Sequence, residues 1–179
     1  MDKCKFIQKE LLYLGHLITA EGLKPNTEKI KAVKNFKLPE TQKQLKGLLG
    51  LLSYYRRFIP NFATVCKPLT KRLKKGSKIE ITDEDYIKCF EKCKTLLCNE
   101  PVLQFPDYTK EFIVTTGASD TGIGDVLSQG PVRQDKPVCY ASRTLNDSEQ
   151  NYSATEKECL AIVWACKQFR PHIFGRHFK

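Results

Sequence analysis

No stretch of this sequence approaches the roughly 18 consecutive apolar residues that a membrane span requires. Its first residues, MDKCKFIQKELLYLGH, carry too many charges for a secretory signal. Internal repeats, low-complexity tracts and long flexible linkers are also absent. With 179 residues, the chain is therefore expected to be globular, cytoplasmic or nuclear rather than secreted, without membrane contact, and built as one ordinary domain or two small ones.

The cysteines lack the spacing of metal ligands. They lie at positions 4, 66, 89, 93, 98, 139, 159 and 166, with no CxxC pair and no Cys/His cluster, so the sequence does not support a zinc site. Cys89 and Cys93 are one helical turn apart and share a face with Tyr86, Phe90 and Leu97. Because free cysteine behaves as a small buried hydrophobe, we expect core thiols in a reducing compartment.

Positive charge is concentrated in the first half of the chain. The formal net charge is +10, but residues 1–80 hold 18 Lys or Arg against 6 Asp or Glu, which is +12, and residues 81–179 hold 12 against 14, which is −2. A basic half is a candidate footprint for a polyanion such as nucleic acid. A solvated basic surface without a partner is the alternative, and composition alone does not decide between them.

The pattern of apolar residues predicts an α/β (α+β) fold in two modules. Residues 5–23 alternate loosely around a turn signal at Glu21-Gly22, which predicts a hairpin. Helices are expected from about residue 27 to Pro39, over 42–58 behind Thr41 as N-cap, and from about 85 to 98. After a boundary near Glu100-Pro101, three antiparallel strands and one long helix from about 154 to 170 are expected.

The helix expected over 42–58 has two faces. Leucines at 45, 48, 49 and 52 form an apolar stripe for a core. On the other side a glycine face of Gly47, Gly50, Tyr54 and Arg57 follows the spacing i, i+3, i+7, i+10. Since glycine inside a helix costs roughly 1 kcal/mol relative to alanine, the pair requires an explanation. Close packing of another helix and close approach of a ligand backbone are both open.

Six runs of the chain resemble one protein family. They are LLYLGHLITAEGLKPNTEKIKAV (11–33), LKGLLGLLSYYRRFIPNFA (45–63), KPLTKRLKK (67–75), PVLQFPDYTKEF (101–112), FIVTTGASDTGIGDVLSQ (112–129) and YASRTLNDSEQNYSATEKECLAIVWACKQFRPHIFGRHF (140–178). In this order they resemble the Pol polyprotein of gypsy-like long-terminal-repeat retrotransposons. The resemblance implies the end of a reverse transcriptase palm, the thumb and a connection-like region over 1–100, and a partial ribonuclease-H-like domain over 101–179.

The resemblance also raises the question of catalysis. Ribonuclease H cleaves phosphodiesters with two divalent metals, Mg²⁺ in the intact family enzyme, and these hard cations need converging carboxylates. Gly117 stands where the family has the aspartate of a TDAS run, Glu158 matches its helix glutamate, and the next family aspartate would lie past Lys179. The YxDD turn of the polymerase is absent. We therefore expect a remnant site at Glu158, no metal ligand set and no cofactor bound by this chain alone.

Two further carboxylates lie in the same strands. Asp120 is close to Gly117 in sequence but occupies a different position, so rescue of the site by Asp120 is not expected. Asp125 replaces the small residue that is usual in the family at this point of the GAVLSQ strand. A charge there is costly if the position is buried and harmless if it is exposed.

What remains of the resemblance concerns holding nucleic acid, here an RNA/DNA hybrid or another duplex. The residues expected to bind it are the hairpin residues Tyr13, Gly15 and His16, the helix residues Gly47, Gly50 and Tyr54, and the basic residues Lys43, Lys46, Arg57, Lys71, Arg72, Lys74 and Lys75. Two alternatives stay open: a host-retained interaction module with a protein on the open sheet edge, and a nuclease completed by the rest of the Pol polyprotein.

Overall fold

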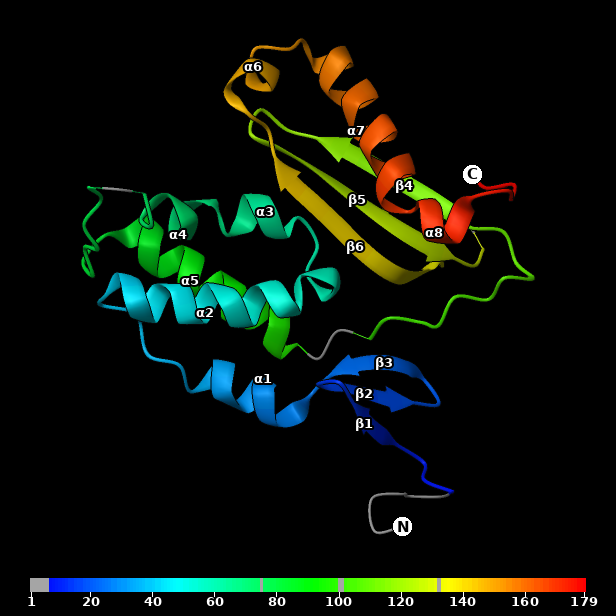
Figure 1. Ribbon diagram of the computed structural model, residues 1–179, viewed down its shortest axis with the longest axis horizontal. Coiled ribbons are helices and arrows are strands. Elements are labelled where there is room, and N and C mark those ends of the chain that lie inside the picture. Colours follow the sequence, from blue (N-terminus) through cyan, green and yellow to red (C-terminus); the bar gives the residue numbers. More distant parts are fainter. Residues whose placement is uncertain (1–6, 75, 100–101, 132) are drawn as a thin grey trace.

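The computed structural model describes residues 7–74, 76–99, 102–131 and 133–179. Its first element is a small antiparallel sheet with the strand order β1-β2-β3 (Figure 1). The strands are β1 (Leu11–Tyr13), β2 (His16–Thr19) and β3 (Gly22–Pro25). The predicted hairpin was one strand short, because a second two-residue turn lies between β1 and β2. Leu14 and Gly15 both have positive φ there, 43° and 70°, which is the conformation of tight hairpin turns.

In the described part of the chain, six helical segments lie between the first sheet and the second. They are α1 (Thr27–Lys34), α2 (Gln42–Tyr54), the 3-10 turn η1 (Arg56–Phe58), α3 (Phe62–Val65), α4 (Lys67–Lys71) and α5 (Glu84–Cys98). Thr41 caps α2 as predicted, in a capping box with Gln44. The helix predicted up to Phe58 changes pitch at Tyr55, and both residues turn into the core with 1% and 0% of their surface exposed.

The leucine stripe of α2 packs with α5 in the largest hydrophobic cluster. All four predicted leucines are buried, and they contact a cluster that includes Tyr86, Phe90 and Cys93. Each cysteine in the described part of the chain is a free thiol, and those at 66, 89, 93 and 139 are buried as expected. Cys159 is exposed, so the expectation of core thiols does not hold for it.

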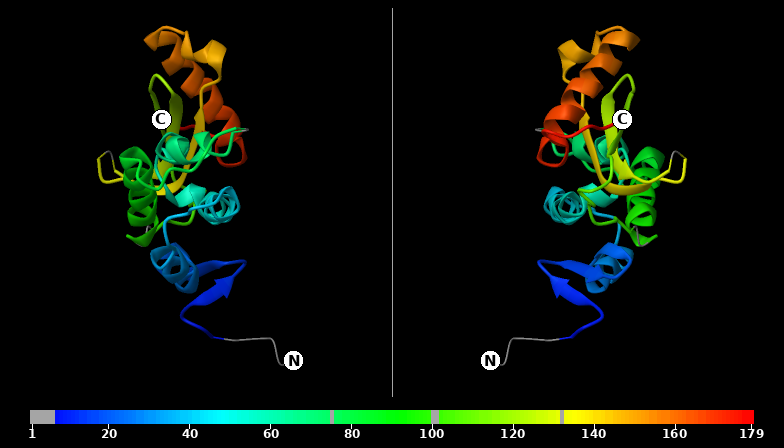
Figure 2. Two further views of the ribbon diagram at one scale, coloured as in Figure 1. Left: turned by 90° about the vertical axis from the view of Figure 1, so that its left-hand side faces the viewer. Right: turned by 90° about the vertical axis from the view of Figure 1, so that its right-hand side faces the viewer.

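The second sheet consists of β4 (Ile113–Ala118), β5 (Gly122–Gln129) and β6 (Lys136–Thr144), antiparallel in the order β4-β5-β6. The long helix α7 (Ala154–Gln168) covers one face, flanked by the short helices α6 (Asp147–Gln150) and α8 (Arg170–Ile173). The η1 turn and α3 lie on the opposite side of the sheet (Figures 1 and 2). Three antiparallel strands and one long helix are confirmed.

Ser142 of β6 joins the second sheet to the helical part. Its carbonyl oxygen accepts a hydrogen bond from the Arg56 guanidinium at 2.6 Å, and its hydroxyl accepts from the Ala63 amide at 2.9 Å. Only 2% of Ser142 is exposed. The helical part and the second sheet are therefore joined by two partly buried hydrogen bonds to one buried residue.

The segment between α5 and β4 returns along the first sheet. Leu23 and Leu103 exchange two backbone hydrogen bonds of 2.7 and 2.9 Å. The boundary predicted at Glu100-Pro101 lies outside the described residues, so the limits 1–100 and 101–179 stay a prediction. At the free edge of β4, Phe178 pairs in parallel with Phe112. This contact covers the start of the sheet edge that was expected to be open. In the described part of the chain no helix has the length and apolar character to cross a membrane.

Candidate functional site

The glycine face of α2 is open. Lys43, Lys46, Gly47 and Gly50 are all exposed, and a Cβ atom placed on either glycine would meet no heavy atom within 4 Å among the described residues. Close packing of another helix, one of the two interpretations of these glycines, is therefore wrong for the chain as described. An unblocked helix backbone flanked by two lysines is a surface that a polyanion can approach closely.

The turn between β1 and β2 docks onto the C-terminal end of this face. The Tyr54 hydroxyl donates to the Leu14 carbonyl, and the Tyr55 hydroxyl donates to the Gly15 carbonyl at 2.7 Å. A Cβ on Gly15 would lie 3.1 Å from the Tyr54 hydroxyl oxygen, and its φ of +70° favours glycine as well. The sequence run YLGH is thus fixed in place by two adjacent tyrosines of the helix.

His16 anchors the same turn through its ring. The ring stacks on Phe58 with a centroid distance of 5.6 Å and lies 5.3 Å from Tyr54. Its Nδ1 donates to the Leu14 carbonyl at 2.8 Å, and its buried Nε2 has no hydrogen-bond partner among the described residues. Tyr13, in contrast, is 59% exposed. The structure therefore brings Gly15, His16 and Tyr54 together and leaves Tyr13 at the surface.

Of the basic residues after α3, Lys71 and Lys74 are exposed, but Arg72 is engaged. Its guanidinium pairs with Asp83, donates to the Pro68 carbonyl at 2.6 Å and lies 4.8 Å from the centre of the Tyr86 ring. The Tyr86 amide and the Arg72 charge lower the pKa of Asp83. Arg72 therefore stabilises the α4–α5 region and is not free for a phosphate, unlike the expectation.

Lys75, the last of the predicted basic contacts, lies outside the described residues. Lys43 and Lys46 precede and flank Gly47 on α2, and Arg57 follows Tyr54 in η1 with an exposed side chain. Four of the predicted basic and glycine contacts on α2, together with Arg57 in η1, are thus accessible, while Tyr13, Lys71 and Lys74 are exposed elsewhere on the molecule.

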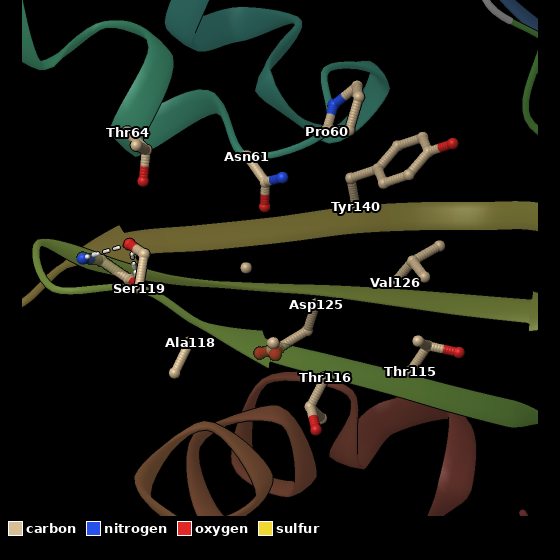
Figure 3. Close-up of a pocket in the computed structure, with 13 residues that line it drawn as sticks. Pro60, Asn61, Thr64, Thr115, Thr116, Ala118, Ser119, Asp125, Val126 and Tyr140 are labelled. Carbon is tan, nitrogen blue, oxygen red and sulfur yellow. Dashed lines mark hydrogen bonds between the residues drawn. The ribbon is translucent and has the colours of Figure 1, made fainter. Parts of the chain in front are cut away.

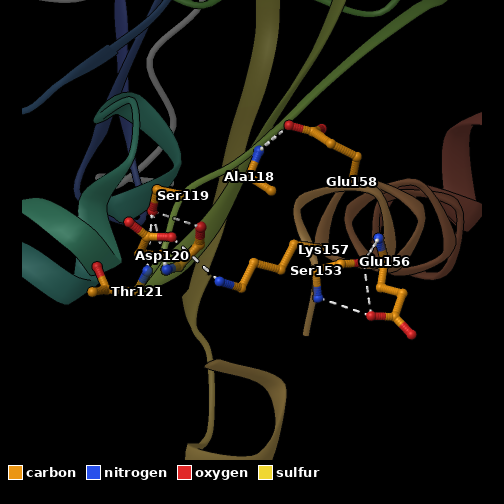
Figure 4. Close-up of polar contacts among 9 residues, drawn as sticks. Ala118, Ser119, Asp120, Thr121, Ser153, Glu156, Lys157 and Glu158 are labelled. Atoms are coloured by element: carbon orange, nitrogen blue, oxygen red, sulfur yellow. Dashed lines mark hydrogen bonds and ion pairs between the residues drawn. The ribbon is translucent and has the colours of Figure 1, made fainter. Parts of the chain in front are cut away.

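Glu158 lies where the resemblance places it, beside the strand that carries Gly117. Its Oε1 accepts a hydrogen bond from the Ala118 amide at 3.3 Å (Figure 4). A Cβ on Gly117 would meet only the Gly124 carbonyl oxygen, at 3.8 Å, so an aspartate side chain would have room. Glu156 takes a different role, because it closes the capping box with Ser153 at the start of α7.

Asp120 does not replace the missing carboxylate. Its side chain is 98% exposed and pairs with the largely buried Lys157 at 3.3 Å (Figure 4). Across the described ranges no three His, Cys, Asp or Glu side chains are grouped so that they could hold a metal ion. Two divalent cations require several converging oxygen ligands, and a glycine at 117 supplies none. The residues present therefore do not fit the two-metal centre of a ribonuclease H.

Asp125 is buried, which is the arrangement in which a charge at this position is costly. Only 4% of it is exposed, and neither carboxylate oxygen has a well-formed hydrogen bond in the described part of the chain. Burial and then the charge of Glu158 raise its pKa to about 7, against the opposing influence of the Gly117 amide and of Arg143. Asp125 lines a cavity of about 380 Å³ and lies with Thr116 on the α7 side of the strands, across from Asn61 and Tyr140 (Figure 3).

A second cavity, of about 530 Å³, was missed from the sequence. We call it the arginine pocket, and the lining residues that define it are Arg56, Arg57, Arg143, Trp164, Gln168 and His172. They come from η1 and from the elements β6, α7 and α8, which follow η1 in the chain by more than 75 residues. The sequence indicated Arg56 and Arg57 as sources of positive charge and gave no signal for the other lining residues.

Comparison with known proteins agrees with this geometry. Residues 83–179 match the family described as "RNase H-like domain found in reverse transcriptase". The chain is 49% identical over 178 residues to the retrovirus-related Pol polyprotein from transposon 297 of Drosophila melanogaster, covering 99% of this chain and 16% of that protein. It is 38% identical over 185 residues to the one from transposon gypsy of the same organism, covering 97% and 18%. The chain thus spans less than a fifth of the length of these relatives.

Two solved structures share the fold. The foamy viral protease-reverse transcriptase dRH in complex with double-stranded DNA has a TM-score of 0.82 and 25% identity, over 96% of this chain and 30% of that one. The foamy viral protease-reverse transcriptase in complex with an RNA/DNA hybrid has a TM-score of 0.83 and 24% identity, over 99% of this chain and 24% of that one. The mixed α/β architecture predicted from the sequence is confirmed.

Proposed function

This chain belongs to the family of RNase H-like domains found in reverse transcriptases, as a segment similar to gypsy-like Pol polyproteins, and we propose that it holds duplex nucleic acid without cleaving it. The open glycine face of α2 carries the proposal. Two helix glycines that no described residue covers, flanked by exposed lysines, have no role in the packing of this chain.

The contacts proposed are of two kinds. Lys43, Lys46 and Arg57 would meet phosphates, which supplies affinity with little base specificity. Gly47 and Gly50 would let the backbone or the sugars of a strand come close to the helix. The turn held by Tyr54 would place the first sheet beside the same strand. Lys71 and Lys74 would add charge at longer range.

Double-stranded DNA is the partner best supported, since it is bound by the structural relative with 25% identity. An RNA/DNA hybrid is the finer proposal, because that duplex suits a reverse transcriptase. Magnesium would belong to the intact enzyme, and this chain supplies too few carboxylates for it: Glu158 stands beside Gly117, and Asp120 is paired with Lys157. Cleavage by this chain alone is therefore not proposed.

The test uses the 179-residue chain and a labelled duplex, as DNA and as RNA/DNA hybrid, in fluorescence anisotropy across a salt series with magnesium. We expect binding that weakens steeply with salt, and intact nucleic acid on a denaturing gel. The double substitution Lys43→Gln/Lys46→Gln should reduce the slope of log K against log salt by about 2, since each phosphate contact contributes about 0.9 on B-DNA.

The decisive variant is Gly50→Gln, which covers the helix backbone with a good helix former. We expect at least a tenfold loss of affinity without loss of stability, because open space surrounds this position. Thr95→Gln, which adds the same side chain to an exposed site on α5, is the matched control and should bind like the unsubstituted chain. Equal affinity of both variants, or absence of salt-sensitive binding, would refute the proposal and favour a protein-interaction module.

A further inference from the structure

We propose that the arginine pocket is a second phosphate site, which holds a phosphodiester group of the strand that lies along the glycine face. The inference rests on the proposed function and adds to it a place that the nucleic acid would enter between the two parts of the fold. The pocket opens where η1, the edge strand β6 and the helices α7 and α8 meet.

Charge is the first argument. Three arginines line the pocket and no Asp or Glu does. Two of them are fixed by the protein itself: Arg56 donates to the Ser142 carbonyl at 2.6 Å, and Arg143 binds both carboxylate oxygens of Glu149 at 2.7 and 2.9 Å. Arg57 has neither a hydrogen bond nor an ion pair within the described ranges. The charge of Arg143 is compensated by Glu149, whereas Arg56 has no acidic partner among the described residues, so the guanidinium of Arg57 is available beside a second uncompensated positive charge.

The surroundings of Arg57 strengthen this point. His172 lines the pocket, and burial together with the charge of Arg57 lowers its pKa, so that its imidazole is neutral at physiological pH. Its Nδ1 is 3.2 Å from the Tyr108 hydroxyl. Since no carboxylate lines the pocket to neutralise Arg57, an oxyanion would be the natural partner of this side chain.

The remaining wall suits the sugar-phosphate backbone. Gln168 lies in the last turn of α7 and contributes an amide with no partner among the described residues, which can donate to a phosphate oxygen. The half-buried ring of Trp164 contributes an apolar surface and lies under Arg143, with 5.9 Å from the guanidinium carbon to the ring centre. Aromatic rings beside basic side chains are typical of surfaces that pack on sugars and bases.

The arginine pocket adjoins the glycine face, and this position favours a nucleic-acid strand over a free nucleotide as the source of the phosphate. Arg57 connects the two surfaces, because it lines the pocket and lies in η1, directly after the C-terminal end of the helix α2 that carries Gly47 and Gly50. A strand that runs along α2 past Gly50 towards η1 would therefore bring one of its phosphates to the pocket. A polymer that already lies on α2 is therefore favoured over a free nucleotide.

Trp164 gives a direct readout, because it is the only tryptophan of the chain. The 179-residue chain is titrated with duplex DNA at low salt while tryptophan emission and acrylamide quenching are followed beside anisotropy of the labelled duplex. We expect at least a twofold reduction of the quenching constant at saturation. Unchanged emission and quenching while anisotropy reports binding would overturn the pocket but leave the proposed function standing. Absence of binding would remove both.

Substitutions then test the residues. Arg57→Gln should reduce the salt slope by about 1, and Gln168→Glu, which lies outside the glycine face, should weaken binding about fivefold and abolish the protection of Trp164. Lys167→Gln is the control for Arg57→Gln, since it removes one exposed charge from α7 at a residue that does not line the pocket. If Lys167→Gln reduces the affinity and the salt slope as much as Arg57→Gln does, the pocket is not a specific phosphate site.

Two further titrations distinguish the source of the phosphate. Inorganic phosphate and a nucleoside monophosphate are each added to the chain without duplex, with the emission of Trp164 as the signal. We expect only weak changes at millimolar concentration, and none in Arg57→Gln. Protection of Trp164 by the monophosphate at the same concentration as by duplex phosphate would overturn the assignment to a strand and make the pocket a nucleotide site.

Discussion

Replacing Asp125 with asparagine should stabilise the protein. The gain in the free energy of unfolding over the unsubstituted chain should be larger at neutral pH than at acid pH. The carboxylate is buried in β5 without a well-formed hydrogen bond, and its pKa is raised from the ordinary value of 3.8 to about 7. Between these two pH values the folded state keeps a proton that the unfolded chain has released. The free energy of unfolding must therefore fall as the pH rises through this window and level off above it.

The size of the effect follows from the same values. A difference of one unit between the folded and unfolded pKa corresponds to 1.36 kcal/mol. The ionisation of Asp125 therefore lowers the free energy of unfolding by about 4 kcal/mol at pH 8. At pH 5 about 1.7 kcal/mol of it is already present. The stabilisation by Asp125→Asn should thus grow by about 2.5 kcal/mol between pH 5 and pH 8, and by less if water from the adjoining cavity of about 380 Å³ solvates the carboxylate.

Urea unfolding of both proteins at pH 5 and pH 8 measures this difference. Changes in packing caused by the amide are the same at both pH values and cancel in the comparison. Asp147→Asn, at an exposed position in the first turn of α6, is the control for the loss of one carboxylate. If Asp125→Asn raises the free energy of unfolding by the same amount at the two pH values, within about 0.5 kcal/mol, the carboxyl group of Asp125 does not have a raised pKa and the reasoning is refuted.

Three other predictions concern the glycines and the docked turn. Gly50→Ala should raise the free energy of unfolding by about 0.5 to 1 kcal/mol in urea melts, because the position is helical and open, and a decrease would contradict that geometry. Tyr55→Phe should cost about 1 kcal/mol and speed amide exchange around Gly15, whose carbonyl it leaves without the 2.7 Å hydrogen bond; unchanged exchange would argue against the docking. Gly117→Asp should fold, since its Cβ has room, and should leave an RNA/DNA hybrid uncut with magnesium on a denaturing gel, because no further cluster of ligands is present among the described residues. Cleavage would show that a centre can be completed there.

Patterns local in sequence predicted most of the fold. The leucine spacing identified the buried side of α2, the Thr41 cap was found in place, and the three strands of the second sheet were recognised from β-branched and aromatic runs. The pattern of apolar residues did not reveal the turn at Leu14 and Gly15, and only the resemblance had indicated a hairpin at Tyr13 to His16. A leucine with positive φ carries no sequence signal, and this turn depends on the tyrosines that hold it.

The candidate site was less accessible from the sequence. Exposure could not be predicted for Arg72, whose partner Asp83 lies eleven residues away, nor for Asp125, whose burial depends on α7. The two explanations of the helix glycines could be separated only by knowing what packs on them. The arginine pocket combines residues more than a hundred positions apart, so only the folded chain shows it.

The pair of hydrogen bonds at Ser142 has a consequence for how the molecule comes apart. Because one buried residue of β6 is bonded to both η1 and the start of α3, neither part can leave without exposing unsatisfied polar groups of the other. Thermal denaturation should then be a single cooperative transition, with equal calorimetric and van 't Hoff enthalpies. A protease should release no long-lived half of the chain, so that the grip on a duplex and the sheet behind it would persist or be lost as one unit.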